Sequence, residues 1–222
     1  MFNVAIDGPA GAGKSTIAKK VAARLGSIYV DTGAMYRAMA LYMIRQGIDA
    51  DDAQAISAQC KQADISIDFR DGQQVVLLFG ENVNHLIRTP QVSDMASRTS
   101  VNPDVRTKLV ELQQKLGREK DVVMDGRDIG TVVLPDAPVK IYLTASVQVR
   151  ADRRYKELLE KGEKTDLAAI EAQIRERDER DMNREVSPLK QAEDAVLVDT
   201  SDMTIDEVTQ RIMEIIEAKR NG

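Results

Sequence analysis

Gly8-Pro9-Ala10-Gly11-Ala12-Gly13-Lys14-Ser15 matches the pattern G-x-x-x-x-G-K-[ST] at every fixed position. Glycines in such a loop let successive backbone N–H groups curl around an anion. The lysine supplies a point charge for the outer phosphates of a nucleotide, and the serine hydroxyl can bind Mg²⁺. Residues 8–16, which include Thr16, are therefore predicted to bind a nucleotide triphosphate, with Ser15 as the Mg²⁺ ligand.

The flanking residues have the patterns of the strand and the helix that this loop requires. Residues 2–6 form a short apolar run that suits a buried strand. Apolar residues after Ser15 recur at helical spacing through residue 25, and Gly26 stands where such a helix would end. This order favours nucleotide binding over the alternative, a glycine-rich turn with an unrelated lysine.

Composition narrows the possible functions of the chain. The 222 residues suggest one domain, and the net charge of -5 argues against a general nucleic-acid binder. No apolar run approaches the length of a membrane span, and the N-terminus lacks the pattern of a signal peptide. Cys60 is the one cysteine and His85 the one histidine, so a disulfide, a histidine metal site or a serine triad is not expected. We expect a cytoplasmic monomer with small-molecule substrates and with no nucleic-acid or membrane partner.

Strand-like and helical patterns alternate along most of the chain. Further strands are expected at 28–30, 122–124, 139–143 and 195–198, and further helices at 35–45, 105–116, 147–159, 167–181 and 205–219. This alternation predicts a parallel sheet with helices on both faces. Residues 65–83 differ, because two apolar runs flank Asp71-Gly72, which is typical of an antiparallel β-hairpin.

Arginines near the ends of the expected strands and helices suggest a second phosphorylated ligand. They include Arg37, Arg127 and a group around Arg177 and Arg184. The planar guanidinium binds phosphate oxygens in pairs, and α/β sheets place ligands where strands end. The N-K-x-D pattern of guanine-specific switch proteins is absent. Several arginines together with a phosphate-binding loop point to phosphoryl transfer between two nucleotides.

At these residues the chain resembles the bacterial cytidylate kinases, which are nucleoside monophosphate kinases of the P-loop class. The resemblance runs essentially end to end, and it is carried by residues 6–15, by 31–37 (DTGAMYR), by 125–133 (DGRDIGTVV) and by 177–184 (RDERDMNR). It implies a three-layer α/β P-loop kinase fold with a central five-stranded parallel sheet, a small antiparallel β insertion in the NMP-binding region and a helical lid. The implied single unit, 1–222, has a core of 1–63, 101–149 and 185–222, an NMP-binding insertion at 64–100, and a lid with flanking helices at 150–184.

The resemblance also implies roles for individual residues. The catalytic set would be Lys14, Arg127, Arg184 and Arg153, the last on a mobile lid at about 150–164. Arg37, Arg127 and Arg184 would hold the acceptor phosphate, Ser97, Arg106 and Asp128 the cytosine, and Arg177 with Asp181 the ribose. Thr32, where relatives often carry serine, Tyr36, Asp125 and Gly126 would complete the CMP site. Asp125 would also hold Mg²⁺ through water, and adenine would lie near residues 200–202.

The implied reaction is ATP + CMP ⇌ ADP + CDP, with Mg²⁺ as the cofactor and dCMP as a second acceptor. The acceptor is already an anionic phosphate oxygen, so no strong general base is needed. Two alternatives stay open at this point. One is a related kinase that acts on UMP, dTMP or a non-nucleotide acceptor. The other is a regulator that binds ATP without acceptor-stimulated turnover.

Overall fold

The computed structural model describes residues 1–70, 72–160 and 162–221. The elements in chain order are β1 (Val4–Asp7), α1 (Lys14–Leu25), β2 (Ile28–Asp31), α2 (Thr32–Arg45), α3 (Ala53–Cys60), β3 (Ile65–Arg70), β4 (Gln73–Leu78), β5 (Glu81–Asn82), α4 (Pro90–Thr99), α5 (Pro103–Glu119), β6 (Val122–Gly126), a π-helix η1 (Ile129–Val133), β7 (Val139–Thr144), α6 (Val147–Glu160), α7 (Leu167–Asn183), β8 (Val196–Asp199) and α8 (Ile205–Asn221).

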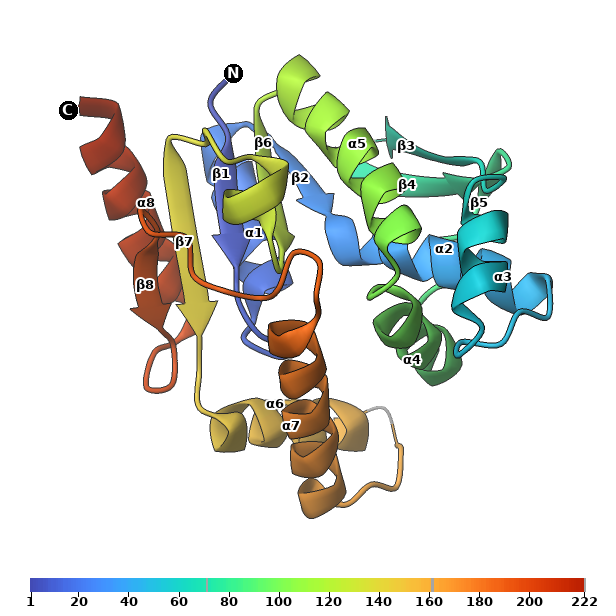
Figure 1. Ribbon diagram of the computed structural model, residues 1–222. Helices are drawn as coiled ribbons and strands as arrows, with labels where there is room; N and C mark the ends of the chain where they lie inside the picture. The colour runs from blue at the N-terminus through green and yellow to red at the C-terminus, as the bar shows by residue number, and fades with distance from the viewer. Residues whose placement is uncertain (71, 161, 222) are drawn as a thin grey trace.

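The central sheet confirms the expected parallel α/β architecture (Figure 1). Within the described residues it has five strands in the order β2-β6-β1-β7-β8, and every neighbouring pair is parallel. Ile6 in the middle strand pairs with Asp125 of β6 on one side and with Ile141 of β7 on the other. This register brings the carboxyl ends of β1 and β6 to the same edge of the sheet, where the loops after both strands begin.

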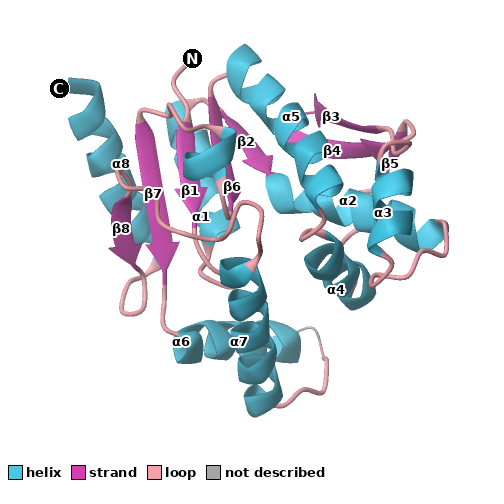
Figure 2. Cartoon of the chain, in the orientation of Figure 1, coloured by secondary structure: helices cyan, strands magenta, loops and turns pink. Residues whose placement is uncertain are grey.

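Helices cover both faces of this sheet (Figure 2). Alternate side chains of a strand point to opposite faces. Val4 and Ile6 accordingly belong to a core formed with α1 and α8, while Ala5 between them belongs to a core formed with η1 and the end of α5. Among the helices in the described part of the chain, none is both long and apolar enough to cross a membrane.

The segment after α3 forms the expected antiparallel insertion. β3 and β4 pair in register from Ile65–Leu78 to Arg70–Gln73, although Asp71 of the predicted turn lies outside the described residues. The short strand β5 adds to β4, and α4 follows. These elements share one apolar core with α2, α3 and α5, in which Met35, Met39 and Met43 are fully buried. The insertion is therefore packed on the helix that follows β2.

Capping side chains explain why several helices begin earlier than the apolar pattern predicts. Asp31 accepts a hydrogen bond from the Ala34 backbone at 2.9 Å, so α2 begins at Thr32 rather than at residue 35. Asn102 caps α5 in the same way. Thr89 caps α4, a helix that begins with a proline and that the apolar spacing does not predict.

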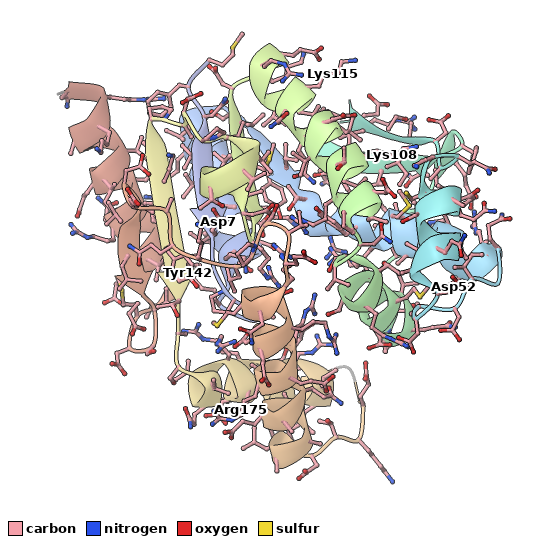
Figure 3. All side chains as sticks on the ribbon, in the orientation of Figure 1. Asp7, Asp52, Lys108, Lys115, Tyr142 and Arg175 are labelled. Atoms are coloured by element: carbon pink, nitrogen blue, oxygen red, sulfur yellow. The ribbon has the colours of Figure 1, made fainter. Side chains whose placement is uncertain are left out.

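A buried carboxylate ties the loop after β1 to the segment after β6. Asp7, labelled in Figure 3, is only 4% exposed. Its two oxygens accept hydrogen bonds from the backbone N–H groups of Ile129 at 2.8 Å and Gly130 at 2.7 Å. Burial raises the pKa of Asp7 to about 6, although these hydrogen bonds act in the opposite direction. The contact fixes the first two residues of η1 relative to the glycine-rich loop.

Gly8 brings the start of that loop against the neighbouring strand. Its φ of 147° lies in the region open almost only to glycine, and a Cβ atom there would stand 1.9 Å from the carbonyl oxygen of Leu143 in β7. No side chain can be accommodated without moving β7 or the loop.

We therefore expect Gly8→Ala to lower the melting temperature much more than Gly47→Ala does. Gly47 also has a positive φ, 67°, but a Cβ atom there meets nothing within 4 Å. The control substitution should cost about 1–2 kcal/mol for the left-handed backbone alone. Thermal unfolding followed by circular dichroism measures both, and equal losses would contradict the close approach to β7.

The pKa of Asp7 predicts a pH-dependent contribution to stability. Its folded value, about 6, exceeds the ordinary 3.8, so between these pH values the folded state keeps a proton that the unfolded state has lost. The contribution of Asp7 to the free energy of unfolding should therefore fall by roughly 3 kcal/mol as the pH rises through that window.

Denaturant titrations of the wild type and of Asp7→Asn at pH 4, 5, 6 and 7 measure this dependence. The stability of the wild type relative to the variant should decrease with rising pH. Asp136→Asn, at an exposed position, is the matched control. A stability difference between the wild type and Asp7→Asn that does not change with pH would contradict the raised pKa.

Candidate active site

A cleft of about 670 Å³ opens where β1, β2 and β6 end. Its walls come from the glycine-rich loop, the start of α2, α4, the segment after β6, and the helices α6 and α7. The predicted site residues that line it are Ala10, Gly11, Ala12, Gly13, Lys14, Ser15, Thr16, Thr32, Tyr36, Arg37, Ser97, Arg106, Asp125, Gly126, Arg127, Asp128, Arg153, Arg177, Asp181 and Arg184. Gly8 and Pro9 belong to the loop but lie behind this surface.

The loop holds its own lysine in place. Gly11 and Gly13 have left-handed backbone angles, which let the chain turn tightly before α1 begins. The Lys14 side chain is buried, and its Nζ donates a hydrogen bond to the carbonyl oxygen of Pro9 at 2.7 Å. Burial, and after it the charge of Arg127, lowers the pKa of Lys14 to about 7. An anion in the loop would favour the charged form of this lysine.

Three hydroxyl and carboxylate groups meet beside the loop. Asp125, at the end of β6, accepts hydrogen bonds from the Ser15 hydroxyl at 2.9 Å and from the Tyr29 hydroxyl at 2.8 Å. Burial, and after it the charge of Asp31, raises the pKa of Asp125. Oxygen ligands of this kind are those that Mg²⁺ prefers, so the residues present fit the predicted metal site. Tyr29 holds the carboxylate from its far side.

Arg37 is fixed by a carboxylate and, through it, by the insertion. Asp31 pairs with Arg37 at 3.0 Å and with Arg88 at 2.8 Å. Burial alone would raise the pKa of Asp31, but the two arginines lower it below its ordinary value. Gln74 of β4 accepts a hydrogen bond from the Asp31 backbone N–H at 2.6 Å and donates to its carbonyl oxygen at 3.2 Å. The hairpin thus holds the peptide that carries this carboxylate.

A buried ion pair closes the part of the cleft nearest α5. Arg106 pairs with Asp128 and donates to the carbonyl oxygen of Ser100 at 3.2 Å. The Arg106 guanidinium lies 5.4 Å from the ring centroid of Tyr36, a cation–π distance. Arg184 approaches the other oxygen of Asp128 at 3.8 Å. The structure therefore brings together the three charged groups Arg106, Asp128 and Arg184.

Further arginines stand on the side of the cleft formed by α7. Arg127 donates to Asp181 at 2.8 Å, and Arg184 lies 3.8 Å from the same carboxylate. Arg177 differs, because its Nε is buried and has no hydrogen-bond partner within the described structure. Burial, and after it the charge of Arg127, lowers the pKa of Arg177 to about 10. Among the described residues, no carboxylate forms an ion pair with this buried cation.

The arginines of α6 each have a polar partner. Arg150 pairs with Asp178 of α7 at 2.6 Å and donates to the carbonyl oxygen of Ala10 at 2.9 Å. Arg153 donates to the carbonyl oxygen of Thr200 at 2.7 Å. Arg154 is exposed and pairs with Glu157. The predicted lid, 150–164, thus comprises most of α6 and the start of its connection to α7, with residue 161 outside the described part.

Sequence reasoning assigned no role to several residues that complete the site. Asp31 stood in a quoted motif without a role, and its position three residues before Ala34 is a capping signal that could have identified it. Tyr29, Gln74 and Arg88 carry no sequence signal, because each joins the site only through a tertiary contact. Gln74, for example, is 43 residues from the Asp31 backbone that it holds.

Comparisons with known proteins identify the family of the chain. The model of the family described as cytidylate kinase matches residues 4–218. A cytidylate kinase of Caldicellulosiruptor saccharolyticus is 50% identical over 96% of this chain and 95% of its own length. That of Lactobacillus gasseri is 50% identical over 100% of this chain and 96% of its own. A gluconokinase structure from Sinorhizobium meliloti 1021 is 15% identical and covers 99% of this chain and 94% of its own length. Its TM-score of 0.51 shows a similar fold. The chain belongs to the cytidylate kinase family.

Proposed function

We propose that the protein transfers the γ-phosphoryl group of ATP to CMP, giving ADP and CDP, with dCMP as a second acceptor. The observation that carries this proposal is the layout of one cleft. The glycine-rich loop with Lys14 forms one part of it, and Arg37, Arg127 and Arg184 stand in another, next to the Arg106–Asp128 pair. Family membership supports the same reaction. We further propose that the protein works as a monomer in the cytoplasm.

The donor is assigned to the loop from Gly8 to Thr16. Its backbone N–H groups and the N-terminus of α1 would bind the phosphates, and Lys14 would leave the Pro9 carbonyl for an outer phosphate oxygen. Ser15 and Asp125 would hold Mg²⁺, which neutralises charge on the transferring group. Arg153 would add positive charge from α6, and residues 200–202 would lie near the adenine.

The acceptor phosphate is assigned to Arg37, Arg127 and Arg184. Their charges would offset the repulsion between the acceptor phosphate and the γ-phosphate. Asp31 and Asp181 already hold two of these guanidinium groups in place, so little reorganisation is needed when CMP binds. Thr32, Tyr36 and Gly126 would line the same part of the site.

The base and the ribose are assigned to the part of the cleft between α4 and α7. One oxygen of Asp128 is held by Arg106, and the carboxylate would accept a hydrogen bond from the N4 amino group of cytosine. Uracil has a carbonyl at this position, which a carboxylate repels. Ser97 would contact the same base, and Arg177 with Asp181 the ribose hydroxyls.

We expect Lys14→Met to lower turnover by about a hundredfold or more while the fold persists, because a charge on the transferring phosphates is lost. A coupled assay for ADP formation measures this effect, and circular dichroism checks the fold. Lys20→Met is the control, since Lys20 lies on the same helix but is exposed and pairs with Asp206. Near-normal turnover of Lys14→Met would refute the assignment of the loop.

We expect Asp128→Asn to raise the kcat/KM of UMP relative to that of CMP, because a carboxamide can donate to the O4 atom of uracil. A panel of CMP, dCMP, UMP, dTMP and no acceptor, each with ATP, gives these ratios. The same panel distinguishes the alternatives, since a regulator would show no stimulation by any acceptor. An unchanged CMP/UMP ratio would contradict the role given to Asp128.

A further inference from the structure

One hydrogen bond links α7 to α4 beside the acceptor part of the cleft. Nη1 of Arg180 in α7 lies 2.8 Å from the hydroxyl oxygen of Ser97 in α4. Ser97 is buried and lines the cleft, whereas Arg180 is not among the described residues that line it. An arginine outside the cleft thus touches one of the residues to which the proposed function assigns the base.

The guanidinium of Arg180 makes a second hydrogen bond within its own helix. Glu176, one helical turn earlier in α7, accepts a hydrogen bond from Nη2 of Arg180 at 2.5 Å. Because the guanidinium group is planar, a hydrogen bond at Nη2 also constrains the direction in which Nη1 points. The same guanidinium thus bonds Glu176 through Nη2 and Ser97 through Nη1.

This contact sets the direction of hydrogen bonding at Ser97. A hydroxyl group has one proton to donate and two lone pairs to accept with, while a guanidinium can only donate. In its bond to Arg180 the Ser97 oxygen is therefore the acceptor. Its own proton makes no hydrogen bond to any described residue, although serines in helices often donate to the carbonyl oxygen one turn earlier. The proton remains for a ligand in the cleft.

We propose that Arg180 is a positioning residue for base selection, because it fixes Ser97 as a hydrogen-bond donor to N3 of cytosine. N3 of cytosine is an acceptor, whereas N3 of uracil carries a proton and would oppose a donating hydroxyl. A positive charge on the accepting side of the hydroxyl also makes it a stronger donor. The inference rests on the proposed function, since it concerns the base of the same acceptor.

Arg180→Met tests the inference by removing the donor while keeping an unbranched side chain on α7. The kcat/KM of CMP should fall about tenfold, the usual effect of one hydrogen bond to a charged or polarised group, and that of UMP should change little. The CMP/UMP ratio should fall by the same factor. An equal loss for both nucleotides would show a merely structural contact and would overturn the inference.

Arg175→Met is the matched control. Arg175 lies on the same helix and pairs with Glu171 at the same four-residue spacing as Arg180 with Glu176, but it is exposed and has no contact with α4 among the described residues (Figure 3). This variant should leave the CMP/UMP ratio unchanged. A loss equal to that of Arg180→Met would mean that charge on α7, rather than the bond to Ser97, sets the ratio.

A double-mutant cycle with Ser97→Ala separates action through Ser97 from a direct effect. If Arg180 acts through the hydroxyl, adding Arg180→Met to Ser97→Ala should change the CMP/UMP ratio less than about twofold. With 3-deazacytidine monophosphate, which has a C–H group in place of N3, Arg180→Met should leave the kcat/KM unchanged. A tenfold loss in the Ser97→Ala background, or with the deaza substrate, would overturn the inference.

The failure of the inference differs from a failure of the proposed function. A wild-type protein that does not phosphorylate CMP would refute the function itself. A wild type that prefers CMP, with an Arg180→Met variant that keeps the same preference, would refute only the role of Arg180.

Discussion

Asp7 accepts hydrogen bonds from two consecutive backbone N–H groups and thereby joins the start of the glycine-rich loop to the start of η1, two of the segments beside the cleft. Gly8 follows it directly, and Arg127 and Asp128 stand directly before the residues that it holds. The glycine-rich loop and the segment after β6 are thus tied together at one edge of the sheet. Burial of a carboxylate is costly, as its raised pKa shows, so this contact lowers stability while it fixes the distance between two walls of the cleft.

Ion pairs hold side chains in other parts of the cleft in place. Arg37, Arg106, Arg127 and Arg150 each contact a carboxylate on a different element or loop. Such pairs contribute little net stability when they are buried, but they hold long side chains in one geometry before a substrate arrives. A site that must bring two polyanions together benefits from charges that do not have to be ordered during the reaction. Among the described residues, Arg153 and Arg177 also line the cleft, but neither forms an ion pair with a carboxylate.

Local patterns in the sequence predicted the central fold well. Residues 4–25 gave strand, loop and helix in order, and the short apolar runs marked the other strands of the central sheet. The hairpin followed from its two apolar runs. Helix starts were less predictable, because Asp31, Thr89 and Asn102 fix them through caps rather than through apolar spacing. The π-helix after Asp128 has too few residues for any periodic signal.

The motifs indicated which residues line the cleft, but they could not indicate what holds them. Tyr29, Gln74 and Arg180 reach Asp125, Asp31 and Ser97 from 96, 43 and 83 residues away in the chain. Contacts between such distant positions follow from packing, which no local pattern encodes. Which residue would bind which atom of a substrate is taken from the family resemblance and stays a prediction.

The α6–α7 pair is packed in a different way from the rest of the molecule. Its buried apolar residues, Ala151, Leu158, Ile170 and Ile174, form a cluster of their own. Its bonds to the loops and to the segment after β6 are polar, such as those of Arg150 to Ala10 and of Arg153 to Thr200. Water can replace such bonds at little net cost, whereas exposing apolar surface is expensive. A displacement of this pair would therefore break polar bonds but would leave the other apolar clusters of the described residues intact, whereas α4 shares one apolar core with α2.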